Sequence, residues 1–158
     1  MHPVHRNCLA VNAALEAAGA PGRVTILDEP APTAAAAAAL VGVEVGAIAN
    51  SLVFATAEDE PLLVLTSGAH RVDTGKVAAL VGTAKLKRAS AEFVREATGQ
   101  PIGGVAPVAH PAPLRTLVDT ALGDYRQVWA AGGIPHAVFP TTFDELVRIT
   151  GGSPADVA

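Results

Sequence analysis

The residues best suited to chemistry form a glycine-rich segment, residues 99–107, with the sequence GQPIGGVAP. Glycines permit positive φ angles and let a ligand approach the main chain closely. Consecutive backbone N–H groups in such a segment can hold a carbonyl oxygen or a carboxylate. Pro107 restrains the end of the loop. An ordinary turn after a helix explains the same residues equally well, so the residues alone leave both interpretations open.

A second loop of small residues covers residues 130–136, with the sequence AAGGIPH, and follows the only tryptophan. It joins two predicted strands. Its small side chains either leave room for a ligand or simply allow a tight hairpin.

Several other kinds of site are disfavoured. Neither the pattern G-x-x-x-x-G-K-[ST] nor the pattern G-x-G-x-x-G occurs, which argues against nucleotide hydrolysis and dinucleotide binding. His2 and His5 are close in sequence, but no third ligand lies near them. His70 fits a solvated loop, and Cys8 fits the packed side of a helix because no basic residue is placed to activate it. We therefore expect no metal ion and no cofactor.

Basic residues gather in one part of an otherwise acidic chain. The net charge is −4, which argues against a protein that coats nucleic acid through a broad positive field. The stretch of residues 76–96 is nevertheless rich in cations, and its only acids are Glu92 and Glu96. Its cations are Lys76, Lys85, Lys87, Arg88 and Arg95. This stretch is either a nucleic-acid contact or a solvated face.

The elements that position these residues follow from capping and spacing. An apolar stripe before Gly19 predicts a helix near the N-terminus. Four more helices are expected from N-cap residues followed by a terminal glycine, namely Thr33 to Gly42, Asp73 to Gly82, Ser90 to Gly99 and Thr142 to Gly151. Short β-branched runs predict strands at residues 23–27, 51–55, 62–66, 85–87, 116–119, 128–131 and 137–139. The strands at residues 51–55 and 62–66 are expected to form an antiparallel hairpin through the turn at residues 58–61. The predicted fold class is therefore mixed α/β with a mixed sheet.

The composition indicates one globular domain over residues 1–158. Hydrophobic residues make up 50% and charged residues 16% of the chain, which is too apolar for disorder. The longest apolar stretch, residues 34–49, contains Glu44 and is too short to span a membrane. A lone cysteine and an N-terminal segment interrupted by Asn12 and Glu16 make the cytoplasm the expected location.

The order of several short segments resembles the YbaK/EbsC family, which comprises freestanding relatives of the editing domain of bacterial prolyl-tRNA synthetases. No single segment is specific, but the ordered set covers nearly the whole chain. The matching segments are residues 41–54, 67–73, 85–88, 98–99, 103–107, 118–119, 131–133 and 146–151.

The resemblance implies a mixed, partly barrel-like sheet flanked by helices and a trans-editing aminoacyl-tRNA deacylase. Such an enzyme hydrolyses the ester of a mischarged tRNA, because a synthetase pocket rejects similar amino acids only about 10–200-fold. The partners implied are the 3′ aminoacyl end of the tRNA and a synthetase. The expected oxyanion donors are the Gly103 and Gly104 N–H groups. Substrate contacts are expected from Ser67, Val105, Pro107, Ala131, Gly132 and His136, and tRNA contacts from Lys76, Lys85, Lys87 and Arg88.

One position departs from the family pattern. The family places a lysine before the Ser/Thr-Leu-Val-Phe strand, where it is thought to hold the tRNA terminus, and this chain has Asn50 there. Asparagine is shorter and uncharged. Three interpretations follow: a deacylase that uses Asn50 or another group, an impaired member that binds an amino acid, an aminoacyl ester or tRNA without efficient hydrolysis, or an interaction module with a vestigial pocket.

Overall fold

The computed structural model describes residues 5–31 and 33–158, and it has one mixed eight-stranded sheet with helices around it. The helices are α1 (Arg6–Ala17), α2 (Ala34–Val41), α3 (Thr74–Val81), α4 (Ala91–Thr98) and α5 (Phe143–Thr150). The strands are β1 (Thr25–Ile26), β2 (Ile48–Thr56), β3 (Pro61–Ser67), β4 (Leu86–Arg88), β5 (Arg115–Asp119), β6 (Val128–Ala131), β7 (Ala137–Thr141) and β8 (Ser153–Ala155). Two 3₁₀ turns, η1 (Val45–Ala47) and η2 (Thr120–Asp124), complete the order.

The predicted helix boundaries are confirmed by the cap geometry. The N-cap side chains of α2, α3, α4 and α5 each accept a hydrogen bond from the N–H three residues further on. Each of these helices then ends at a glycine with a φ between +64° and +78°. A side chain at such a φ is strained, so the glycines stop the helices where the sequence indicated.

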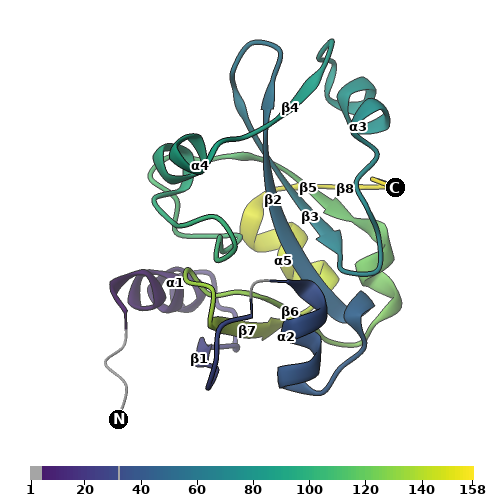
Figure 1. Ribbon diagram of the computed structural model, residues 1–158. Helices are drawn as coiled ribbons and strands as arrows, with labels where there is room; N and C mark the ends of the chain where they lie inside the picture. The colour runs from purple at the N-terminus through teal and green to yellow at the C-terminus, as the bar shows by residue number, and fades with distance from the viewer. Residues whose placement is uncertain (1–4, 32) are drawn as a thin grey trace.

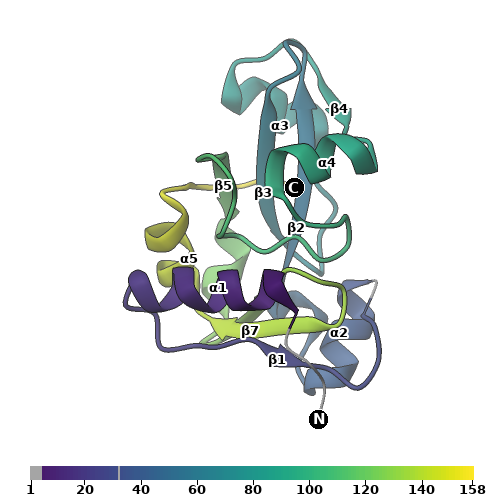
Figure 2. The same ribbon diagram turned by 90° about the vertical axis from the view of Figure 1, so that its left-hand side faces the viewer.

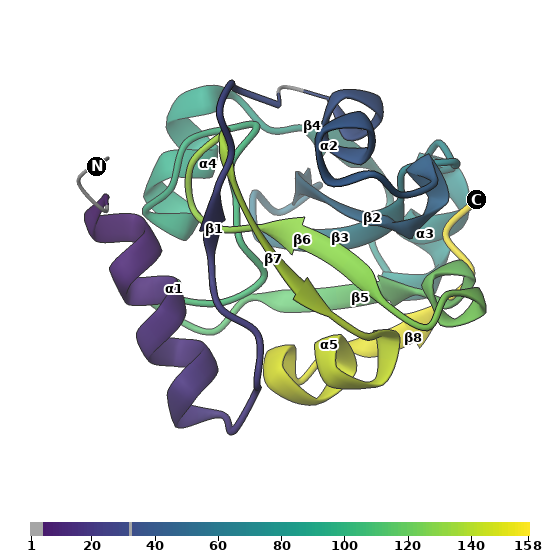
Figure 3. The same ribbon diagram turned by 90° about the horizontal axis from the view of Figure 1, so that it is seen from below.

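The sheet is organised around β2. This strand forms the predicted antiparallel hairpin with β3, pairs in parallel with β6 and also pairs with β4, which confirms a mixed sheet. The strand order is β1-β7-β6-β2-β3-β5-β8, with β4 on β2 outside this path. Figure 1 shows the long β2–β3 hairpin rising past β4 and α3, and Figure 3 shows the helices arranged around the periphery of the sheet.

Three strands differ from the sequence prediction. Strand β2 begins at Ile48 rather than at Ser51, so Asn50 lies inside it. The strand expected at residues 23–27 is reduced to Thr25–Ile26, which pairs with β7 at the end of the strand order. Strand β8 is absent from the prediction because it is only three residues long and contains Pro154, a residue rare inside strands.

The core packs both faces of β3 and thereby fixes β2. Leu63 and Leu65 belong to the cluster that contains residues of α1, α4 and α5, whereas Leu62 and Val64 pack in the cluster with α3. A strand buried on both faces has little freedom to shift its register. Each of these side chains is fully buried, which stabilises the fold by about 1.5–3 kcal/mol per residue. Among the described residues, no helix is long and apolar enough to cross a membrane.

Candidate functional site

Two adjoining cavities lie where β2 meets the loop between α4 and β5 and the start of α2. The smaller has a volume of about 40 Å³ and the larger about 450 Å³. Figure 2 shows the segment between α4 and β5 passing beside β2. The residues that line both cavities, and so form their junction, are Thr33, Ala34, Asn50, Ser51, Gly103 and Val105.

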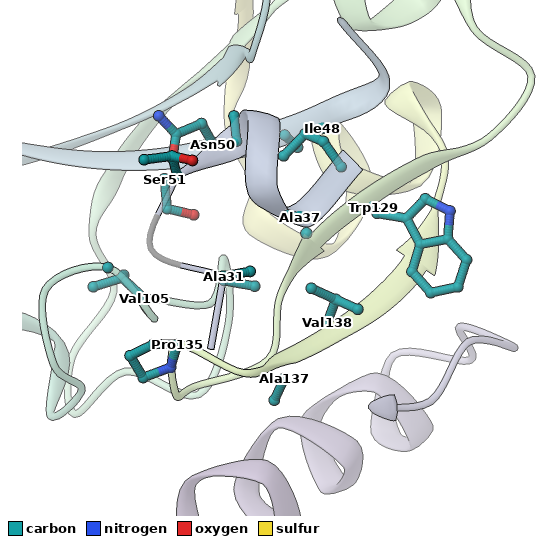
Figure 4. Close-up of a pocket in the computed structure, with 16 residues that line it drawn as sticks. Ala31, Ala37, Ile48, Asn50, Ser51, Val105, Trp129, Pro135, Ala137 and Val138 are labelled. Carbon is teal, nitrogen blue, oxygen red and sulfur yellow. The ribbon is translucent and has the colours of Figure 1, made fainter. Parts of the chain in front are cut away.

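Beyond this junction the side chains that line the smaller cavity are apolar except for the Trp129 indole, whose buried Nε1–H has no hydrogen-bond partner within the described residues. Its walls come from β2, α2, β6, β7 and the β6–β7 loop, and Figure 4 shows several of these side chains around it. The wall residues include Ala31, Ala37, Ile48, Ala130, Ala131, Pro135, Ala137 and Val138. A water molecule needs roughly 10–15 Å³ of such a volume, so this cavity of about 40 Å³ admits a group of roughly three or four heavy atoms.

The larger cavity combines an apolar surface with one positive charge. Leu52, Val53, Phe54, Val94 and Ile102 line it, and the Ile102 side chain is 58% exposed. Arg88 is the only charged residue among the described residues that line either cavity. An apolar surface beside one guanidinium suits a ligand with a flat ring and a phosphate.

The Ser51 hydroxyl is an unusual feature of the junction. Its oxygen is buried and has no hydrogen-bond partner within the described residues. Leaving a buried hydroxyl unpaired costs about 1–3 kcal/mol. Ser51 is also one of the residues that line both cavities, so an uncompensated polar group lies at the junction.

The glycine-rich loop directs alternate N–H groups in different ways. The Gly104 N–H donates to the Pro101 carbonyl at 3.0 Å, and the Ala106 N–H donates to Gln100 Oε1 at 2.6 Å. The Gly103 and Val105 N–H groups have no acceptor in the described part of the chain, and both residues line the two cavities. Gly103 and Val105 are therefore the donors available to a ligand.

Gly104 and Gly132, two of the predicted site residues, serve close packing. A Cβ on Gly104 would lie 2.5 Å from the Ile134 carbonyl carbon. A Cβ on Gly132 would lie 2.9 Å from a Val24 methyl group, and its N–H donates to the Ala137 carbonyl at 2.8 Å. Neither glycine is among the described residues that line the two cavities.

Four other predicted contacts have different surroundings. Ala131 lines the smaller cavity, but Ser67, Pro107 and His136 do not line either one within the described residues. Ser67 is buried and its hydroxyl donates to the Gly46 carbonyl at 2.7 Å. Pro107 is buried beside a separate hollow. The His136 carbonyl accepts from the Leu27 N–H, while its neighbour Pro135 reaches the smaller cavity.

The predicted tRNA-binding cations have different surroundings. Only Arg88 lines the larger cavity. Lys87 pairs with Asp59 at 2.6 Å, and Lys76 pairs with Asp156 at 2.8 Å. The hydrogen bond from Lys76 lowers the pKa of Asp156 below its ordinary value. Lys85 is exposed beside a different hollow next to α3.

The remaining histidines and the cysteine have structural surroundings. His70 does more than face solvent, because its Nδ1 lies 3.0 Å from Oδ2 of the buried Asp119. His5 caps α1 by accepting from the Asn7 N–H, whereas His2 lies outside the described residues. Cys8 is fully buried, and burial raises its pKa. No three His, Cys, Asp or Glu side chains of residues 5–31 and 33–158 gather into a metal-binding group.

Sequence reasoning missed Thr33, Ser51 and Ile102 as cavity residues. The sequence indicates Thr33 only as a helix cap, and its hydroxyl does accept a hydrogen bond from the Ala36 N–H at 3.1 Å. Ser51 follows Asn50 in the segment that carries the resemblance, which was the one available signal. Ile102 gave no signal, because an apolar residue in a loop is usually packed rather than exposed.

Comparison with known proteins agrees with this architecture. A family model described as the aminoacyl-tRNA editing domain matches residues 28–149. The protein YwhH of Bacillus subtilis strain 168 is 30% identical over 123 residues, which are 78% of each chain. The crystal structure of a candidate trans-editing enzyme for prolyl tRNA synthetase is 44% identical, with a TM-score of 0.91 over 98% of both chains. The crystal structure of the hypothetical protein APE2540 is 34% identical, with a TM-score of 0.86 over 94% of this chain and 98% of the other.

The fold is thus that of an aminoacyl-tRNA editing domain. The chain belongs to the aminoacyl-tRNA editing domain family, because the family model covers most of its length. The predicted membership of the YbaK-like group and the predicted mixed fold are both confirmed.

Proposed function

We propose that this protein is a trans-editing deacylase that hydrolyses the ester between a small, wrongly attached amino acid and the 3′ end of a tRNA. The observation that carries the proposal is the pair of adjoining cavities with two available N–H donors at their junction. Family membership supports the same activity. The 44% identity to a candidate trans-editing enzyme for prolyl tRNA synthetase makes a proline tRNA the first substrate to test.

The shapes of the two cavities support a division of the substrate between them. The smaller cavity has room for a side chain of up to about three or four heavy atoms, which includes the small side chains of alanine, 2-aminobutyrate and cysteine. The larger cavity would take the terminal adenosine, with its base against the apolar wall near Ile102 and a phosphate near Arg88. The ester would then lie at the junction.

Hydrolysis at this junction needs a positioned water and a stabilised oxyanion. The water oxygen adds to the ester carbonyl carbon, and the carbonyl oxygen becomes an oxyanion that the Gly103 and Val105 N–H groups stabilise. The bond between the carbonyl carbon and the ribose 3′ oxygen then breaks. That oxygen receives a proton derived from the water, so the products are a free amino acid and an uncharged tRNA.

The described residues that line the cavities include no side chain that commonly acts as a general acid or base for these proton transfers. Among the described residues that line the cavities there is no Asp, Glu, His, Cys or Lys. An aminoacyl ester is already activated, so positioning and oxyanion stabilisation carry the rate in this proposal. Ser51 lines both cavities, and its buried hydroxyl has no hydrogen-bond partner among the described residues.

A second candidate function is binding of an aminoacyl ester or tRNA without efficient hydrolysis. The observation that favours it is Asn50, an uncharged residue at the junction where the family resemblance implies a lysine. The two candidates share the same ligand and differ only in turnover.

Single-turnover hydrolysis of a panel of mischarged tRNAs tests the proposal. The panel comprises proline tRNA charged with alanine, 2-aminobutyrate, cysteine and proline, and binding is measured on the same samples. The expected result is faster release of a small amino acid than in buffer alone. Binding without release favours the second candidate function, and absence of both overturns the proposal.

A further inference from the structure

Gln100 holds the glycine-rich loop from inside the protein. Its side chain is 3% exposed, and its Oε1 accepts the Ala106 N–H at 2.6 Å. Its Nε2 donates to the Val108 carbonyl at 3.2 Å and to the Ala109 carbonyl at 3.4 Å. The buried side-chain amide of Gln100 is thus hydrogen-bonded to the main chain of three residues that follow Gly103, namely Ala106, Val108 and Ala109.

A second side chain secures the same peptide from its other side. His110 Nε2 lies 2.7 Å from the Ala106 carbonyl oxygen, so it donates there as the Nε2–H tautomer. Both hydrogen-bonding groups of Ala106 are therefore bound by side chains. Ala106 itself is fully buried, and it directly follows Val105, a cavity-lining residue whose N–H has no acceptor within the described residues.

We propose that Gln100 is a positioning residue that sets the direction of the Val105 N–H toward the ester carbonyl. The inference rests on the proposed function. The loop has no helix or strand of its own between Gly99 and Leu114, so these hydrogen bonds determine its path. A displacement of about 1 Å at an oxyanion donor is enough to lower a rate by roughly a hundred-fold.

The position of the hydrogen bond explains why Gln100 would act on the rate rather than on affinity. Gln100 is not among the described residues that line either cavity, so it does not touch the substrate. Affinity for the tRNA end depends on the larger cavity and Arg88, which lie outside this network. The oxyanion exists only in the transition state, so a misdirected donor lowers kcat and leaves KM unchanged.

The test is Gln100→Met, which keeps the length of the side chain and removes its hydrogen bonds. The expected result is a fall of ten-fold or more in the single-turnover rate, with the tRNA affinity unchanged within two-fold. Gln100→Asn, which retains the amide on a shorter stem, supplies a second measurement if the methionine variant does not fold. An unchanged rate in a folded variant overturns the proposal, as does an equal loss of rate and affinity.

Thr56→Val is the matched control for loss of a buried polar group. Thr56 is 7% exposed, and its hydroxyl accepts hydrogen bonds from the backbone N–H groups of Glu58 and Glu60 in the β2–β3 turn, away from the cavities. It should lower stability and leave the rate unchanged.

Hydrogen exchange of the Ala106 amide distinguishes a failure of the positioning role of Gln100 from a failure of the proposed deacylase function. In Gln100→Met this amide should exchange at least ten-fold faster than in the native chain, because it loses its acceptor. If the native chain does not hydrolyse any substrate, the proposed function fails and the positioning role fails with it, whatever the exchange rate. If the native chain hydrolyses but the exchange rate does not change, only the positioning role of Gln100 is overturned.

Discussion

Arg88 and Asn50 line the same cavity from neighbouring strands, and the register of β4 against β2 separates them by four residues. Arg88 lies opposite Phe54 in the antiparallel pair, so it stands about 13 Å along β2 from Asn50. A tRNA end whose ester lies at Asn50 would therefore bring its backbone toward Arg88. The other predicted cations, Lys76, Lys85 and Lys87, are not among the described residues that line either cavity, and Lys76 and Lys87 pair with Asp156 and Asp59.

The first prediction concerns salt dependence. Arg88→Gln should lower tRNA affinity and reduce the slope of log affinity against log salt by roughly 0.7–1, the contribution of about one phosphate contact. Lys76→Gln is the control, since its ammonium already pairs with Asp156 and the slope should not change. The measurement is a binding titration at several salt concentrations. Equal slopes for the native chain and Arg88→Gln would remove Arg88 from the tRNA contact.

The second prediction concerns Gly103. Its φ is +87°, and a Cβ there would meet no atom within 4 Å, so Gly103→Ala strains the main chain without a clash. Gly82, at the end of α3, has a φ of +78° and equally open space. Both alanine variants should lose about 1–2 kcal/mol of unfolding free energy.

Only Gly103→Ala should also lower deacylation, by ten-fold or more, because it changes the conformation around one oxyanion donor. The larger Gly103→Val should have the stronger effect. Unfolding in urea and single-turnover hydrolysis provide the two readouts. Equal activity in the two alanine variants would show that the loop does not contact the ester.

Much of the fold could be predicted because its signals are local. Thr33, Ser90 and the glycines that follow their helices act within a few residues, so caps and stops are readable from sequence. The site depends on distant pairings. Lys76 pairs with Asp156, 80 residues away, and Arg88 reaches the larger cavity only because β4 joins β2. The choice between Gly104 and Val105 as a donor depends on the direction of each peptide, which no residue type encodes.

The third prediction concerns side-chain size. Ala131 and Val138 are opposite each other in the β6–β7 pair and both line the smaller cavity. Ala131→Val should narrow the cavity and lower the rate for 2-aminobutyrate relative to alanine, by about ten-fold. Val138→Ala should widen it and shift the preference the other way, at a cost of about 1–3 kcal/mol in unfolding free energy. The measurement is the hydrolysis rate of the two esters on the same tRNA. If the ratio of the two rates is unchanged in both variants, the side chain of the attached amino acid does not bind in the smaller cavity.

The fourth prediction concerns pH and His110. Burial lowers its pKa below the ordinary value of 6.5, while the hydrogen bond to Ala106 acts weakly in the opposite direction. The unfolded chain then binds the proton more readily than the folded chain, so the unfolding free energy falls as pH drops below 6.5 toward the lowered pKa. His110→Gln keeps a donor for the Ala106 carbonyl and cannot titrate.

The stability advantage of the native chain over His110→Gln should therefore be constant above neutral pH and shrink in acid. Urea unfolding of both proteins between pH 4.5 and pH 8 measures this difference directly. Because every other titrating group is common to the two chains, their contributions cancel. A difference that stays constant over the whole range would mean that His110 titrates alike in the folded and unfolded states.

The last prediction concerns Asn50, which stands at the junction of the two cavities. The register of β2 against β3 places it opposite Thr66, within a strand that pairs on both sides, so its main-chain position is fixed. A lysine here would add a positive charge beside the tRNA terminus, as the family resemblance implies. One charge-assisted hydrogen bond contributes about 1.5–3 kcal/mol, or roughly 10–150-fold in rate if it acts in the transition state. Asn50→Lys should therefore raise a weak natural rate by ten-fold or more.

Asn50→Gln is the control for this experiment, because it lengthens the side chain without adding charge and should leave the rate within about two-fold. The measurement is single-turnover hydrolysis of proline tRNA charged with alanine, by the native chain, Asn50→Lys and Asn50→Gln at one salt concentration. Raising the salt should shrink the gain of the lysine variant, since part of its effect is attraction to phosphate. Strong natural hydrolysis that Asn50→Lys leaves unchanged or abolishes would show that this chain holds its substrate through a different arrangement, with Arg88 and Ser51 as the first residues to examine.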